Sequence, residues 1–184
     1  MHKIAVLIGS LRQDSINRKL AHALEKLGGG TFAFDHLDLD LPLYNDDLWA
    51  DPPAGVTALK ARVAAADGVL IVTPEYNRSL PAVTKNALDW GSRPYGHNAW
   101  KGKPVAVCGA SPGSQGTAVA QSQLRSTLVI LGMKAMGEPE VYITFKPDFL
   151  DATGAVANEG SAKFLTGFLD AFAHLIAHDQ SAEP

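Results

Sequence analysis

The stretch KIAVLIGSLRQDSINRKLAHAL, residues 3–24, decides the fold of this chain. It opens with an unbroken apolar run that ends at Gly9, and such a run predicts a strand covered on both faces. From Ser15 onward, apolar residues recur at helical spacing as far as Leu27. A buried strand, a short polar loop and an amphipathic helix are typical of the first half of a βαβ unit.

The same order of strand and helix repeats along the rest of the chain. The sequence predicts further strands over residues 31–39, 68–73, 103–110 and 134–143, the last interrupted around Gly137 and Pro139. It predicts further helices over residues 56–66, 81–93, 114–131 and 161–178, with a polar loop over 40–55 and a frayed tail after Asp179. This alternation indicates an α/β protein with a parallel sheet. Because no linker or repeat divides the chain, we expect one domain over residues 1–184.

Composition excludes several classes of function. The 184 residues carry 16 basic and 19 acidic side chains, a net charge of −3, and contain no basic run, so we expect no nucleic-acid partner. The apolar runs are too short for a membrane span, and the first one predicts a strand rather than a signal peptide. The single cysteine, Cys108, rules out an intrachain disulfide and a Cys-rich zinc site. It favours a reducing, cytoplasmic location.

The loop after the first strand has the composition of an anion site. Sheets of this type bind ligands beyond the carboxyl ends of their strands. Ser10, Arg12, Ser15 and Asn17 gather there just before a helix, whose free N–H groups and dipole attract a phosphate. The alternative is that Asp14 or Ser15 only caps the helix.

Two further loops complete the pattern. Residues 73–81 form a stiff turn between Pro74 and Pro81 in which Tyr76 is placed to pack on a flat ring, although an ordinary surface turn is the alternative. Residues 110–116 are small and let a planar ligand approach the backbone. One loop that suits a phosphate and two loops that suit a flat polar ring together favour flavin mononucleotide (FMN) as the ligand. Neither a dinucleotide fingerprint nor a Walker loop is present, since Pro104 follows Gly102-Lys103 where Ser or Thr is required.

No side chain stands out as a catalytic acid, base or nucleophile. Cys108 lies inside a predicted strand, as a core residue does, and Ser111 is not in a nucleophile elbow. His174 and His178 are four residues apart on the last helix, but a surface pair is the simpler interpretation. We therefore name no catalytic residue and expect no metal site.

Three segments resemble a known family: GSLRQDSINRKLAHAL from Gly9, TPEYNRSLPAVTKNALDW from Thr73, and KGKPVAV with SPG from Lys101. They are similar to the NAD(P)H-dependent FMN reductases, a group that includes quinone, chromate and azo reductases. The tracts DDLWAD and SRPYG-x-N-x-WKGKP look especially like the bacterial ferric reductase B type, an NAD(P)H:acceptor oxidoreductase. The resemblance implies a flavodoxin-like three-layer sandwich with a five-stranded parallel sheet in the order 2-1-3-4-5.

The resemblance also implies roles for particular residues. The residues that match the loop holding the FMN phosphate are Ser10, Arg12, Ser15, Ile16 and Asn17. Those that match the turn along the isoalloxazine edge are Pro74, Glu75, Tyr76 and Asn77, and Ser111 matches a small residue near the cofactor. Family members are typically homodimers, sometimes tetramers, with the flavin sites at the subunit interface.

The implied activity is transfer of a hydride from NADH or NADPH to flavin N5, followed by two-electron reduction of an acceptor in a ping-pong scheme. Quinones, ferric chelates, chromate, azo compounds and free flavins all suit such a site. We expect Arg78 and Arg93 to supply positive charge for the nicotinamide nucleotide or an anionic acceptor, unless both are solvated surface residues. Two alternatives remain: a flavodoxin-type electron carrier, which is usually more acidic than this chain, and a flavin-binding protein without turnover.

Overall fold

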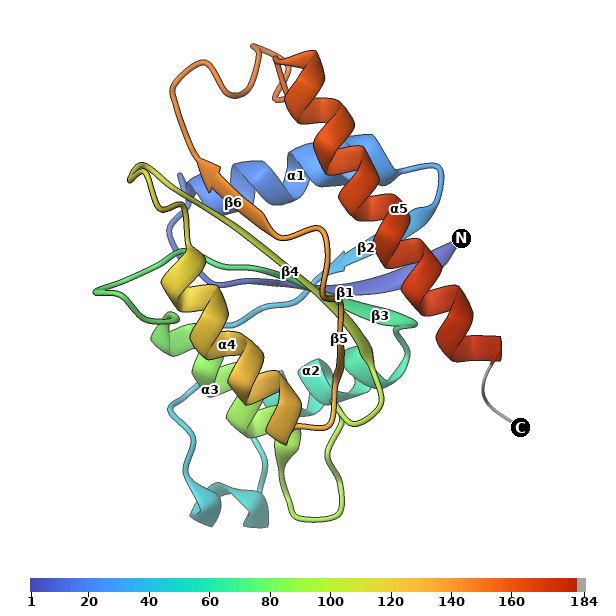
Figure 1. Cartoon of the computed structure of the whole chain (residues 1–184). Helices are drawn as coiled ribbons and strands as arrows, with labels where there is room; N and C mark the ends of the chain where they lie inside the picture. The colour runs from blue at the N-terminus through green and yellow to red at the C-terminus, as the bar shows by residue number, and fades with distance from the viewer. Residues whose placement is uncertain (182–184) are drawn as a thin grey trace.

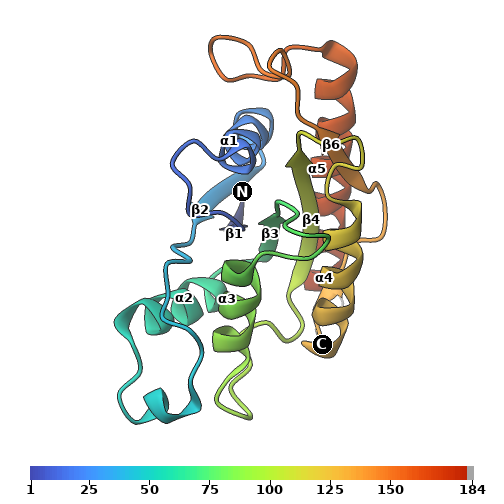
Figure 2. The same ribbon diagram turned by 90° about the vertical axis from the view of Figure 1, so that its left-hand side faces the viewer.

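A parallel β-sheet lies between two helical layers in the computed structural model, which describes residues 1–181 (Figures 1 and 2). The strands are β1 (His2–Ile8), β2 (Phe32–His36), β3 (Gly68–Val72), β4 (Pro104–Ser111), β5 (Lys134–Ala135) and β6 (Val141–Thr144). The helices are α1 (Ile16–Gly28), α2 (Ala54–Ala64), α3 (Ala82–Ser92), α4 (Ala118–Ile130) and α5 (Glu159–Ser181), with a 3-10 helix, η1, over Asp46–Ala50.

The strands run in the order β2-β1-β3-β4-β5, as expected. The predicted fifth strand is two pieces, β5 and β6, and both pair in parallel with β4. Lys134 lies opposite Pro104 near the start of β4, whereas Val141 lies opposite Cys108 farther along it. The break falls at Gly137 and Pro139, where proline has no N–H to donate to a ladder.

Alternation along the central strands divides the core into two halves. In β1, Ile4 and Val6 pack with buried residues of α1 and α5, whereas Ala5 and Leu7 pack with those of α2, α3 and α4. The strands β3 and β4 divide in the same way. Figure 1 shows the corresponding layers, with α1 and α5 on one face of the sheet and the other three helices on the opposite face. The unbroken apolar runs therefore predict doubly covered strands correctly.

Element boundaries differ from the sequence-based ones, most clearly at the start of α4, the end of β2, the loop over 40–55 and the end of α5. The helix predicted from residue 114 begins at Ala118, because Gly116 has a φ of +56° that no helix accommodates. β2 ends at His36 instead of residue 39, and the loop over 40–55 contains η1. α5 continues through Ser181, and the remainder of the expected frayed tail lies outside the described residues. Within residues 1–181, no helix combines the length and the apolarity that a membrane crossing requires.

Two glycines allow the loops at the carboxyl ends of the strands to meet. A Cβ on Gly9 would lie 2.6 Å from Thr84 Oγ1 and 3.0 Å from Pro74 Cδ. A Cβ on Gly109 would lie 2.1 Å from the carbonyl oxygen of Thr73. The chain therefore needs glycine at both positions so that the loop after β3 can pack against β1 and β4.

Candidate functional site

Three loops, each following a strand, enclose one pocket of about 180 Å³. It lies at the strand ends on either side of the β1/β3 boundary, where the strand order reverses and ligands of such sheets bind. The pocket is lined by Ser10, Arg12, Asp14, Ser15, Ile16, Asn17, Pro74, Glu75, Tyr76, Ala110, Ser111 and Pro112. Every cofactor residue expected from the sequence except Asn77 is in this set.

The N-terminus of α1 forms the polar end of the pocket. Ser15 is the N-cap, and its hydroxyl accepts a hydrogen bond from the Arg18 N–H at 3.4 Å. The amides of Ile16 and Asn17 belong to the first helical turn, whose N–H groups have no partner inside a helix. Both serines, Ser10 and Ser15, are only 4% exposed. This end of the pocket therefore offers hydroxyl and amide donors and the positive end of a helix dipole to an anion.

The Arg12 guanidinium is exposed at the rim of the same pocket. Within residues 1–181 it takes part in no ion pair, so its charge is not neutralised by a neighbouring carboxylate. A planar guanidinium beside serine hydroxyls and helix amides is the donor set that a phosphate monoester requires.

Asn17 has a different task from the one that its position suggested. Its side chain is 1% exposed, its Nδ2 donates to the carbonyl of Ala110 at 2.8 Å, and its Oδ1 accepts from the Ala110 N–H at 2.8 Å. The amide thus pairs with β4 as a neighbouring strand would. Both polar atoms are engaged in joining two walls of the pocket, so the group that Asn17 presents to a ligand is its backbone N–H.

Glu75 fastens the loop after β3 to α4. Its Oε2 accepts from the N–H groups of Val119 and Ala120, both at 3.1 Å, and so caps a helix that has no side-chain cap of its own. Its Oε1 accepts from Arg78 Nη1 at 3.1 Å. The carboxylate is 7% exposed. Sequence reasoning placed Glu75 at the pocket but missed this cap, because its partners lie more than forty positions away.

Asn77 and Arg78 form a tight turn at the edge of the site. Their φ angles are 50° and 62°, and Tyr76 and Ser79 exchange backbone hydrogen bonds of 3.0 and 3.1 Å across them. These are the features of a type I′ turn, in which asparagine is favoured and arginine is unusual. Arg78 is held there by Glu75 and by the side-chain oxygen of Gln115.

A second hollow, of about 360 Å³, continues from the pocket. It shares Glu75 and Ser111 with the pocket and is lined in addition by Asn77, Arg78 and residues 113–116. The structure thus places Arg78 beside the pocket. Arg93 is not brought there: it follows the last residue of α3 and lines a separate hollow of about 590 Å³ with Tyr95 and Ile130.

The residues present fit FMN. The α1 end provides the donors that a phosphate needs, and the proline-bracketed turn with the small residues Ala110 and Ser111 leaves room for a flat ring. Tyr76 is 49% exposed beside that space, so its ring is available for stacking. Cys108 is fully buried, and this burial raises the pKa of its thiol, which excludes a thiolate from the site.

Comparison with known proteins identifies the family. The sequence model of the NADPH-dependent FMN reductase family matches residues 2–148 of this chain. A 2-hydroxy-1,4-benzoquinone reductase from Burkholderia sp. is 51% identical over 172 residues, which cover 93% of this chain and 94% of that protein. A quinone reductase from Escherichia coli K12 is 39% identical over 179 residues, 95% of each chain.

Solved structures agree with the sequence comparison. FerB, a flavoenzyme NAD(P)H:(acceptor) oxidoreductase from Paracoccus denitrificans, is 50% identical, has a TM-score of 0.95, and is matched over 97% of this chain and 99% of its own. A flavodoxin from Pseudomonas aeruginosa, 24% identical with a TM-score of 0.56 over 95% of this chain and 99% of its own, shares the fold. The chain therefore belongs to the NADPH-dependent FMN reductase family, and it is an NAD(P)H-dependent oxidoreductase with the flavodoxin-like fold.

Proposed function

We propose that this chain binds FMN in the three-loop pocket and uses NADH or NADPH to reduce quinones and related small acceptors. The observation that carries the proposal is the meeting of an anion-binding helix end with a stiff, proline-bracketed turn in one pocket. When bound, FMN supplies the two-electron chemistry between the nicotinamide and the acceptor. The tasks of this chain are to hold the phosphate, to align the ring and to keep one ring face open.

The phosphate end is assigned to the loop before α1. In this assignment the hydroxyls of Ser10 and Ser15 and the amides of Ile16 and Asn17 donate to phosphate oxygens. Arg12 adds a charge-assisted hydrogen bond from the rim, which is about twice as strong as a neutral one. The dianion then lies where the helix dipole and the guanidinium both stabilise it.

The ring end is assigned to Pro74, Glu75, Tyr76 and Asn77, together with Ser111. Since the Glu75 carboxylate is occupied by α4, this segment contributes through its backbone and through the Tyr76 ring. The cap on α4 and the type I′ turn hold these groups in place before a ligand arrives, which lowers the entropy lost on binding. The stiffness of the turn thus serves the alignment of the ring.

The hollow beside the pocket is the entry that we assign to nicotinamide and acceptor. Arg78 lines it and offers a positive charge to nucleotide phosphates or to an anionic acceptor. The relatives named quinone reductases favour a quinone as the acceptor, with ferric chelates, chromate, azo compounds and free flavins as further candidates. Arg93 would have to act from a different hollow, so Arg78 has the stronger geometric support.

We also propose that the protein is a homodimer. Val129 and Ile130 at the end of α4 are 73% and 83% exposed, and Tyr95, which lines the 590 Å³ hollow together with Ile130, is 93% exposed. Large exposed apolar side chains around a hollow are typical of a surface that another chain covers. With its lone cysteine and NAD(P)H as reductant, the protein suits the reducing cytoplasm.

The assignment of the phosphate end is tested by comparing FMN with riboflavin, which lacks the phosphate. Arg12→Ala should weaken FMN binding about 10- to 100-fold, the range for losing one hydrogen bond to a charged group. Riboflavin binding should stay unchanged in the same variant. The matched control is Lys19→Ala, which removes an exposed positive charge on α1 outside the pocket and should leave both affinities unchanged.

Equal losses for FMN and riboflavin would contradict the assignment, because Arg12 would then contact the ring or stabilise the loop. No loss for either ligand would remove Arg12 from the site. Affinities are measured by quenching of flavin fluorescence on addition of the apoprotein.

A further inference from the structure

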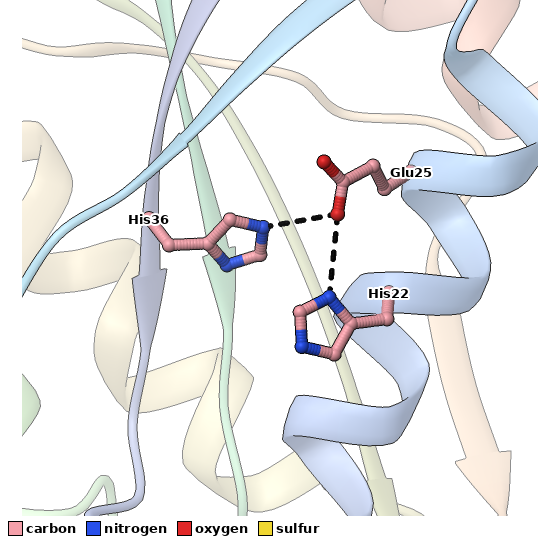
Figure 3. A group of neighbouring side chains, drawn as sticks. All are labelled: His22, Glu25 and His36. Carbon is pink, nitrogen blue, oxygen red and sulfur yellow. Dashed lines mark hydrogen bonds and ion pairs between the residues drawn. The ribbon is translucent and has the colours of Figure 1, made fainter.

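Two histidines and a glutamate meet on the flank of the sheet, away from the pocket described above. His22 and Glu25 lie three residues apart on one face of α1, and His36 is the last residue of β2. One carboxylate oxygen of Glu25 lies 3.3 Å from His22 Nδ1 and 3.3 Å from His36 Nε2. Figure 3 shows both rings turned toward this single oxygen. None of the three residues lines the pocket assigned to FMN.

We propose that His22, Glu25 and His36 form a binding site for a divalent transition-metal ion, with Zn²⁺ as the best match. Two imidazole nitrogens and one carboxylate oxygen are the donor set of many three-ligand zinc sites. The three donor atoms all lie within 4.8 Å of one another. Mg²⁺ and Ca²⁺ prefer sites made only of oxygen atoms, so two imidazoles select against them.

The separations also suit coordination. With zinc–ligand bonds of about 2.0–2.2 Å, two ligands of a tetrahedral ion lie ~3.4 Å apart. Both nitrogen–oxygen separations in the cluster are 3.3 Å. The His22 side chain is 53% exposed, so it can turn toward an ion without displacing packed neighbours. The exposure of Glu25, 42%, leaves the fourth position open to water.

The charged groups at the cluster are the Glu25 carboxylate and, next to His36, the ion pair of Arg62 with Asp35. Lys19 and Lys26 line one hollow with His22. The Glu25 carboxylate supplies the negative charge of the cluster, and without an ion it pairs with both imidazoles. Arg62 approaches His36 and donates to its backbone carbonyl at 2.8 Å. That arginine is paired with Asp35 through its Nε and Nη2, which offsets its charge.

The environment of His36 sets the expected strength of binding. Its Nδ1 is buried and has no hydrogen-bond partner among the residues described. Zinc-binding histidines usually donate this second N–H to an acceptor, and such outer partners strengthen binding 10- to 100-fold. We therefore expect a micromolar site, weaker than the tightest structural zinc centres. An ion held there would join the end of the edge strand β2 to α1.

The test is a calorimetric titration of the untagged, chelator-treated protein with Zn²⁺. A second pair, His174 and His178 on α5, has its Nε2 atoms 3.0 Å apart and could also hold an ion. The matched control therefore replaces both of those residues with alanine and should still bind one equivalent. In that background, Glu25→Gln should weaken zinc binding at least ~10-fold. A variant with His22→Asn and His36→Asn should lose the site.

A second readout shows where the ion lies even if a variant is less stable. Zn²⁺ should raise the melting temperature of the His174→Ala/His178→Ala protein, because a ligand that binds only the folded state stabilises it. The shift should vanish in the His22/His36 variant, whose folding is checked by circular dichroism.

Three results would overturn the proposal. The first is that zinc binding disappears in the His174→Ala/His178→Ala protein, which would assign the ion to α5. The second is that wild-type protein binds no zinc at micromolar concentrations, and the third is that Glu25→Gln binds as tightly as its parent. Since none of the three residues lines the pocket assigned to FMN, these results leave the proposed reductase activity untouched.

Discussion

Asn17 is a single side chain that joins two elements around the pocket. Replacing it with alanine leaves the N–H and the carbonyl of Ala110 without partners in a buried place. Each unsatisfied group costs about 1–3 kcal/mol, so we expect Asn17→Ala to lower the free energy of unfolding by ~2–6 kcal/mol. The measurement is urea denaturation followed by circular dichroism.

The control for this prediction is Gln13→Ala, in the same loop but exposed. It should change stability by no more than ~0.5 kcal/mol, as surface substitutions usually do. If Asn17→Ala were equally mild, water would have to replace both hydrogen bonds, and the proposed bracing role would be wrong.

Asn17 and Glu75 also show what sequence can predict about a site. Their positions follow from the order of strands, because residues just after parallel strands meet at one edge of the sheet. Their hydrogen-bond partners do not follow, since Ala110, Val119 and Ala120 are distant in sequence and reach these side chains only after the sheet has formed. The cluster around His36 could not be predicted for the same reason, because its neighbours His22 and Glu25 are on another element.

At the scale of elements, the cap that Glu75 places on α4 holds the loop after β3, the part of the pocket that we assign to the flavin ring. Glu75→Ala removes the acceptor for two helix amides and frees Arg78. Loss of a helix cap costs about 0.5–2 kcal/mol, so we expect a stability loss of that size together with weaker binding of both FMN and riboflavin. Glu75→Gln keeps one oxygen for the amides and should lose less.

Equal weakening of both flavins distinguishes this variant from Arg12→Ala, which should affect FMN alone. Unchanged flavin binding in Glu75→Ala would show that the loop keeps its shape without the cap.

A second link between elements, Arg62 of α2 with Asp35 of β2, makes stability depend on pH. Hydrogen bonds from Arg62 lower the pKa of Asp35 below its ordinary value of 3.8. A carboxyl group with a lowered folded-state pKa stabilises the fold above its ordinary value, and this stabilisation is lost as the pH falls through the folded-state pKa. Because both groups are partly exposed, we expect Asp35→Asn to cost no more than ~1 kcal/mol at pH 7.

The cost of Asp35→Asn should shrink toward zero in acid, where the wild-type carboxyl is itself protonated. Urea unfolding at pH 7 and at a pH well below 3.8, under the lowered folded-state pKa of Asp35, measures the change. Asp148→Asn, at an exposed carboxylate, should show no such trend. A cost for Asp35→Asn that stays constant with pH would mean that packing, rather than the ion pair, links α2 to β2.

Elements themselves were predictable where a local pattern specifies them. Unbroken apolar runs and helical spacing locate the central strands and the helices that cover them. The start of α4 was not predictable, because it depends on the left-handed Gly116, whose Cβ would meet the backbone of Tyr142 at 2.8 Å. The sequence likewise predicts that Arg93 supplies a charge at the site. In the structure Arg93 follows the last residue of α3 and lines a separate hollow.

At the scale of the whole molecule, the exposed end of α4 predicts self-association. We expect light scattering to report a dimer, and Ile130→Asp to shift it toward the monomer, because a buried interface does not tolerate an unpaired charge. Lys146→Asp, on the exposed segment after β6, should leave the dimer intact. A wild-type protein that is monomeric at all concentrations would contradict the proposal.

The most direct test of the central claim is a spectroscopic titration of the whole protein with its cosubstrate. We predict that the protein, loaded with FMN and kept free of oxygen, loses its yellow colour within seconds of adding one equivalent of NADH or NADPH. A quinone should then restore the colour. A protein that retains no FMN, or whose bound FMN stays oxidised in excess NADH and NADPH, would contradict the account.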